Sequence, residues 1–146
     1  MPPESPTVAH LSQVIHDVTA PAFLLGALAG YISLLIARMN RVIDRSQALN
    51  AIGDNDDAKG YLKSDIPRLK RRTALLNRAI LFSTISAIVA SLVVIVSFVS
   101  AYLNFRHEYV VGLLFILSIG FFVTSLINLG LETRIALHEY DHFGGK

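Results

Sequence analysis

Three long stretches of the chain contain no Asp, Glu, Lys, Arg or His, and this pattern constrains the fold more than any other feature. They are Val18–Ala37 with 20 residues, Ala79–Phe105 with 27 and Tyr109–Leu131 with 23. An α-helix that crosses a bilayer core of about 30 Å needs about 20 apolar residues. One charge at the centre of such a helix costs about 2.5–3.5 kcal/mol on insertion scales. The sequence therefore predicts an all-α membrane protein with three transmembrane helices.

The composition supports this class and excludes several others. Of the 146 residues only 16% are charged, and the mean hydropathy is +0.52, whereas about 25% of residues are charged in an average soluble domain. The chain has no cysteine, which excludes disulfides, cysteine nucleophiles and thiolate metal sites. The net charge of +2 lacks the strong basic field of nucleic-acid-binding proteins. We expect a single membrane domain over residues 1–146, with no cofactor and no nucleic-acid partner.

The distribution of basic residues predicts the orientation in the membrane. Arg38–Arg78 holds ten of the thirteen Lys and Arg residues and, against five aspartates, is net +5. The positive-inside rule places this segment in the cytoplasm, with the N-terminus outside and the C-terminus inside. Tyr102, Phe105 and Tyr109 cluster around the expected outer link, as interfacial aromatic residues do. Anionic lipid headgroups are expected partners of the basic collar at the inner surface.

Hydrophobic spacing and turn signals divide the rest of the chain. Val8, Leu11, Ile15 and Val18 recur at spacings of 3, 4 and 3, which predicts an amphipathic helix on the outer membrane surface. Asp17 or Thr19 is expected to cap the first span, with Pro21 in its opening turn. The expected segments are an interfacial helix (8–18), span 1 (19–37), a cytoplasmic helical hairpin (38–78), span 2 (79–105), span 3 (109–131) and a cytoplasmic tail (132–146).

The hairpin is predicted from two arms of helical spacing around a polar turn. Gly53–Asp57 is typical of a turn, and Ser64 or Asp65 before Pro67 predicts a helix start. The hydrophobic residues of the returning arm have the spacing of a coiled-coil seam. Because of the helix-start signal before Pro67, part of this seam can instead form a separate short turn. The seam positions are Leu62, Ile66, Leu69, Thr73, Leu76 and Ile80.

Two spans carry faces of small residues, which let helix backbones approach closely in lipid. In span 1 the face is Ala22, Gly26, Gly30, Ser33 and Ala37. In span 2 it comprises Ala79, Ser83, Ser86, Ala87, Ala90, Ser97 and Ala101, which share one side of a helical wheel. The span 2 face predicts either helix packing or a serine-lined pore. Two such faces on a chain of three helices favour a homo-oligomer.

Asn128 and Glu132 place polar groups near the inner end of the third span, four residues apart on one helix face. Arg38 and Arg78 are the nearest partners in depth, since they stand at the inner ends of the other two spans. Ionisable groups at this depth usually pair or mark a pathway. The alternatives are a structural polar cluster, which we favour, and an ion or proton site.

The tail sequence from His138 to His142, HEYDH, matches the HExxH pattern of zinc hydrolases. A third ligand is missing from the match, and the upstream histidines fall across the membrane in the expected topology. His138 and His142 are therefore weak metal candidates, and no enzymatic activity is expected.

Two arginine-rich motifs resemble a known family. They are Arg38-Met-Asn-Arg41-Val-Ile-Asp44-Arg45 and Leu69-Lys-Arg71-Arg72, which leads into Asn77-Arg78. With Pro21-Ala-Phe-Leu-Leu they resemble the bacterial membrane family called domain of unknown function 2721, over roughly residues 10–130. The resemblance implies a multi-pass protein of the bacterial inner membrane with its polar signature at the cytoplasmic mouth. It implies no activity.

The same motifs predict a polar clasp between the arms of the hairpin. Arg38, Arg41 and Arg45 share a helix face with Asp44 as their nearby acid. Asp44 is expected to bridge to Arg71, Arg72 or Arg78, with Asn77 in the same arm. The alternative is a solvated basic collar. For the whole chain we expect an oligomeric structural or interaction protein, with an ion-channel or transporter subunit, and more distantly a membrane metallohydrolase, as alternatives.

Overall fold

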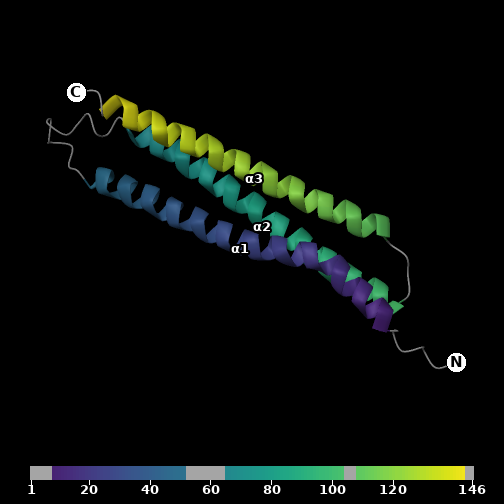
Figure 1. Cartoon of the computed structure of the whole chain (residues 1–146). Coiled ribbons are helices and arrows are strands. Elements are labelled where there is room, and N and C mark those ends of the chain that lie inside the picture. Colours follow the sequence, from purple (N-terminus) through teal and green to yellow (C-terminus); the bar gives the residue numbers. More distant parts are fainter. Residues whose placement is uncertain (1–7, 52–64, 104–107, 144–146) are drawn as a thin grey trace. The chain divides into compact units, whose positions relative to one another are not determined.

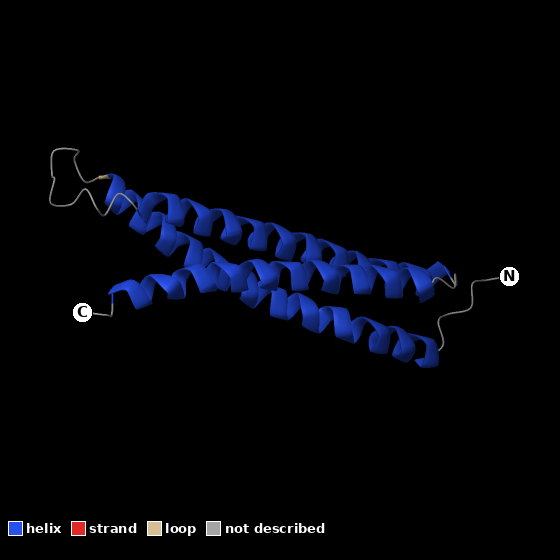
Figure 2. Ribbon diagram, turned by 90° about the horizontal axis from the view of Figure 1, so that it is seen from above, coloured by secondary structure: helices blue, strands red, loops and turns tan. Residues whose placement is uncertain are grey.

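The computed structural model describes residues 8–51, 65–103 and 108–143, and this part of the chain is helical except for short ends (Figures 1 and 2). The helices are α1 (Val8–Asn50), α2 (Ile66–Leu103) and α3 (Glu108–Phe143). All three are long and apolar enough to cross a membrane, which confirms the all-α class with three spans. At 1.5 Å per residue they are about 65, 57 and 54 Å long, so each extends beyond the hydrocarbon.

Helix α1 passes through the expected boundary between the interfacial helix and the first span without a break. Thr19 does not cap a new helix, because it lies inside α1, where its Oγ1 donates to the Ile15 carbonyl oxygen at 2.7 Å. Pro21 lies inside α1 rather than in a first turn, and its missing N–H leaves the Asp17 carbonyl without the usual helical donor. A full break here would leave more backbone groups unsatisfied, which apolar surroundings penalise.

Helix α2 begins at Ile66, next to Asp65 and Pro67, where the turn signals predicted a start. It continues without interruption to Leu103. A separate short turn, which the sequence left open as an alternative, is absent between Ile66 and Ile80. Leu62 and the predicted turn at Gly53–Asp57 lie outside the described residues.

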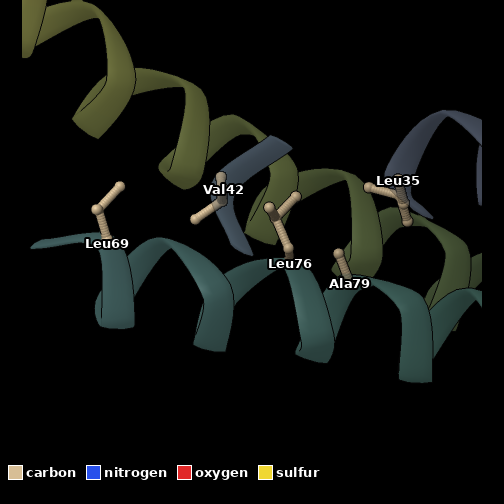
Figure 3. Close-up of a cluster of buried hydrophobic side chains, with 5 residues drawn as sticks. All are labelled: Leu35, Val42, Leu69, Leu76 and Ala79. Atoms are coloured by element: carbon tan, nitrogen blue, oxygen red, sulfur yellow. The ribbon is translucent and has the colours of Figure 1, made fainter. Parts of the chain in front are cut away.

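The chain divides into two compact units, each built from parts of all three helices. Unit 1 comprises Met1–Gly30 and Ser83–Phe122, and unit 2 comprises Tyr31–Phe82 and Val123–Lys146. Unit 2 contains a buried apolar cluster in which Leu35 and Val42 project from α1 toward Leu69, Leu76 and Ala79 of α2 (Figure 3). Met39, Leu49, Ile80 and Leu129 are partly buried against it. The cluster joins the two arms of the predicted hairpin and contains alternate positions of its hydrophobic seam.

The two faces of α2 differ as the helical wheel indicates. The small residues Ala79, Ser83, Ser86, Ala90 and Ser97 are buried. The opposite face exposes large apolar residues: Leu81, Ile88, Leu92, Ile95, Val99 and Leu103. Helices α1 and α3 also expose large apolar side chains, such as Phe23 and Ile116. Such extensive apolar surface fits contact with lipid rather than with water.

Leu76 and Leu81 offer a direct test of which face of α2 packs inside the protein. Leu76 is completely buried, whereas Leu81 is 54% exposed on the same helix. Leu76→Ala opens a cavity in the cluster, and we expect it to lower the free energy of unfolding by about 2–5 kcal/mol. Thermal unfolding in mild detergent measures the effect. Leu81→Ala is the matched control, with less than about 1 kcal/mol expected because its surroundings are lipid or detergent in both states. Equal losses would contradict the assignment of the faces.

Candidate functional site

Glu132 is the most deeply buried ionisable residue among those that the structure describes, with 1% of the residue exposed. It follows the third charge-free stretch directly, one position after Leu131. Its Oε1 accepts from Nε of Arg72 at 2.9 Å and lies 2.8 Å from Nη2 of the same guanidinium. Its Oε2 accepts from Nη1 of Arg38 at 3.1 Å. Each carboxylate oxygen is therefore bound by a different arginine.

Three helices of unit 2 contribute to this site. Arg38 comes from α1, Arg72 from α2, and Glu132 and Thr133 from α3. Nη1 of Arg38 also donates to Oγ1 of Thr133 at 3.0 Å. That hydroxyl in turn donates to the Leu129 carbonyl oxygen one turn earlier, at 3.0 Å. Arg38, Arg72, Glu132 and Thr133 are referred to below as the Glu132 cluster.

Charge and burial explain why the Glu132 cluster needs two arginines. A buried carboxylate is costly to desolvate unless its oxygens are paired and hydrogen-bonded. The side chain of Arg72 is 16% exposed and that of Arg38 is 40% exposed, so the pair with Arg72 is the drier one. With two guanidinium groups and one carboxylate, the cluster carries a net charge of +1. It joins α1, α2 and α3 electrostatically at the ends of the first and third apolar stretches.

The arrangement differs from the clasp that the arginine motifs predicted. Arg72, one of the three expected partners of Asp44, is bound to Glu132 instead. Asp44 is exposed and forms no ion pair or hydrogen bond with the described residues. Nη2 of Arg45 lies 3.9 Å from a carboxylate oxygen of Asp65, which is a long contact for an ion pair. The other expected members are exposed: Arg41, Arg71, Asn77 and Arg78.

Arg38 and Glu132, which the sequence placed at a similar depth, are in contact, whereas Arg78 and Asn128 are not part of this contact. Arg78 is exposed and makes no ion pair with the described residues. Asn128 donates from Nδ2 to the Thr124 carbonyl oxygen of its own helix at 2.8 Å, so this contact lies within α3. The sequence does not predict the contact between Arg72 and Glu132, because no pattern of residues relates a position in α2 to one sixty positions later in α3.

Unit 1 contains a second polar contact, between two completely buried serines of α2 and α3. Ser86 Oγ donates to the Ser118 carbonyl oxygen at 2.7 Å, and Ser118 Oγ donates to the Ser86 carbonyl oxygen at 2.9 Å. The two Oγ atoms lie 3.1 Å apart. Each hydroxyl therefore directs its hydrogen to the facing backbone, which holds the two helices in close contact. The span 2 pattern indicated Ser86, whereas Ser118 stands among large apolar residues that show no small-residue face.

Unit 2 repeats this kind of contact with another serine of α3. Ser125 is buried, and its Oγ donates to the Ala79 carbonyl oxygen of α2 at 2.5 Å. The Tyr31 hydroxyl of α1 lies 3.2 Å from the same oxygen of Ser125. By contrast, Ser97 bonds to the Val93 carbonyl of its own helix. The buried serines of the contacts between helices therefore serve packing within the chain.

The small-residue face of span 1 has a different environment. Ala22, Gly26, Gly30, Ser33 and Ala37 are all exposed. In the part of the chain that the structure describes, a Cβ atom added at Gly26 or Gly30 would meet no heavy atom within 4 Å. The structure therefore leaves this face uncovered.

The described residues contain no group of three or more His, Cys, Asp or Glu side chains that could hold a metal ion. The side chains of the weak candidates His138 and His142 lie outside the described residues.

The chain matches the model of a protein family over most of its length. The model of the family described as "Protein of unknown function (DUF2721)" matches residues 18–142. The chain belongs to this family. The DUF2721 match contains all four residues of the Glu132 cluster and reaches His142, beyond the range of the resemblance seen in the motifs. No curated protein and no solved structure matches the chain.

Substitution of Glu132 tests the energetic role of the cluster. Glu132→Gln removes the carboxylate and leaves two neighbouring guanidinium groups without their counter-charge, so we expect a loss of about 3–5 kcal/mol. Thermal unfolding in mild detergent is the measurement. Asp44→Asn is the control, since an exposed acid with no partner among the described residues should change stability by less than about 0.5 kcal/mol. A larger loss for Asp44→Asn would favour the clasp that the sequence predicted.

Proposed function

We propose that this protein is a homo-oligomeric membrane protein with a structural or interaction role. In this proposal it lies in the bacterial inner membrane, with its N-terminus outside and its C-terminus in the cytoplasm. The observation that carries the proposal is the uncovered small-residue face of α1, which is defined by Ala22, Gly26, Gly30, Ser33 and Ala37.

The energetics of glycine support an interface at this face. A glycine in a helix interior costs about 1 kcal/mol relative to alanine, and α1 carries two of them four residues apart. Among the described residues, no segment comes close enough to require a glycine at either position. In lipid, helices associate through close backbone packing, for which such a face is well suited. A second copy of the chain would use the space that Gly26 and Gly30 leave open.

The hydrogen bonds of the buried serines favour packing over a pore. Ser86, Ser118 and Ser125 each donate to a backbone carbonyl of a facing helix. A buried hydroxyl that donates its one hydrogen to a backbone carbonyl cannot also donate it to water in a channel. The alternative function, a serine-lined channel, therefore has less support than the structural role.

Leucine substitution in the α1 face tests the oligomer. Gly30→Leu should weaken the contact between copies, because the added side chain separates the backbones. We expect smaller particles by light scattering in mild detergent, with unchanged helical circular dichroism. Gly120→Leu is the matched control, since Gly120 of α3 is equally open but has large apolar neighbours along its face. An unchanged mass for Gly30→Leu would contradict an interface at this face.

Cysteine labelling tests the orientation, and the absence of natural cysteine makes the background low. Cysteines introduced at Ser5 and Asn55 should react oppositely with a membrane-impermeant thiol reagent applied to intact cells. We expect Ser5→Cys to react and Asn55→Cys to react only after the membrane is opened. The reverse pattern would invert the proposed topology. It would leave the proposed oligomer unaffected.

A further inference from the structure

Only one of the three nitrogens of the Arg38 guanidinium, Nη1, donates hydrogen bonds to the described residues. Of its five N–H donors, the two on Nη1 face Glu132 and Thr133. The remaining three, on Nε and Nη2, have no partner among the described residues. The side chain is 40% exposed, so these donors can reach a group outside the protein.

The charge of the Glu132 cluster favours an anion at these donors. Both oxygens of Glu132 are already bound, one by each arginine, so the carboxylate neutralises only one of the two cations. Arg38 is the more exposed of the two arginines and has the longer contact with the carboxylate, 3.1 Å against 2.8 Å for Arg72. Exposed basic residues nearby in the sequence, among them Arg41 and Arg134, add to the positive potential.

The position of Arg38 along α1 indicates which anion is within reach. It is the first residue after the apolar stretch that ends at Ala37, and Glu132 is likewise the first after Leu131. Both therefore stand where hydrocarbon gives way to the headgroup layer, which is about 5–8 Å thick on each side of a bilayer. An arginine at this depth extends its head toward that layer. Lipid phosphates are the anions found there.

The geometry of the remaining donors of Arg38 fits a phosphate group. The two non-bridging oxygens of a phosphodiester match the planar pair of donors that Nε and Nη2 present. The hydrogen bonds to Glu132 and Thr133 orient the guanidinium in advance, which reduces the entropy lost on binding. We propose that Arg38, held by Glu132 and Thr133, is the anchor of a specific site for the phosphate of an anionic phospholipid. This site does not require the proposed oligomer.

Lipid binding to the full-length protein tests the assignment. The protein is purified in neutral detergent and titrated with phosphatidylglycerol or phosphatidylcholine, and bound lipid is counted by native mass spectrometry. Phosphatidylglycerol should bind more tightly than phosphatidylcholine. Arg38→Lys keeps the charge but loses the planar donor pair, so its affinity for phosphatidylglycerol should fall about tenfold. Arg41→Lys is the matched control on the same helix, with a change of less than about twofold.

A second variant covers the case in which Arg38→Lys does not fold. Thr133→Val removes one contact that orients the guanidinium and leaves every charge in place. Its affinity for phosphatidylglycerol should fall about threefold, again relative to Arg41→Lys.

Three outcomes would overturn the proposal. Equal losses for Arg38→Lys and Arg41→Lys would indicate a diffuse basic collar. An unchanged affinity in both Arg38→Lys and Thr133→Val would place the lipid elsewhere. Displacement of phosphatidylglycerol by inorganic phosphate at equal concentration would show that the site selects a free anion and not a lipid.

Discussion

Within the hydrocarbon of a bilayer, an apolar side chain gains little by leaving lipid for a neighbouring helix. The membrane-spanning parts of this protein therefore depend on close packing and polar contacts between helices. Ser86 and Ser118 provide both, because two small side chains bring the backbones together and each hydroxyl donates to the facing carbonyl. Ser125 makes the same kind of contact with Ala79. Large apolar residues of α2 such as Leu81, Ile88 and Ile95 lie on the other face and are exposed.

The Glu132 cluster stabilises the helices by a different interaction at the end of the apolar stretches. There a carboxylate buried in the protein contacts arginines from two other helices, and removing Glu132 would leave both arginines without their counter-charge. Such a cluster specifies the pairing of helices more strictly than apolar contacts do, because only one arrangement satisfies all of its hydrogen bonds. In the same unit, Val42 and Leu69 are buried in the apolar cluster. These residues lie beyond the charge-free stretches, where burial from water does stabilise packing.

Part of this site could be predicted from the sequence, and the reason lies in the geometry of a bilayer. Residues that end different apolar stretches share a depth, so the sequence alone relates Arg38 to Glu132. Depth does not distinguish between residues at one level, which is why Arg78 is an equal candidate on this criterion. Arg72 reaches Glu132 with a long side chain from beyond that level. Asp44 has suitable arginines in the sequence, yet it lies on an exposed face and has no partner among the described residues.

The sequence by itself determined the class of the protein, the number of spans and the two faces of α2. These properties follow from local physics, since lipid excludes charge and a helix repeats every 3.6 residues. Only the tertiary structure decided that α1 continues through Pro21, that Ser86 meets Ser118, and that Glu132 rather than Asp44 binds Arg72. Contacts between helices depend on the rotation and depth of each helix relative to its neighbours. Packing of the whole chain sets these quantities, and no local pattern of residues encodes them.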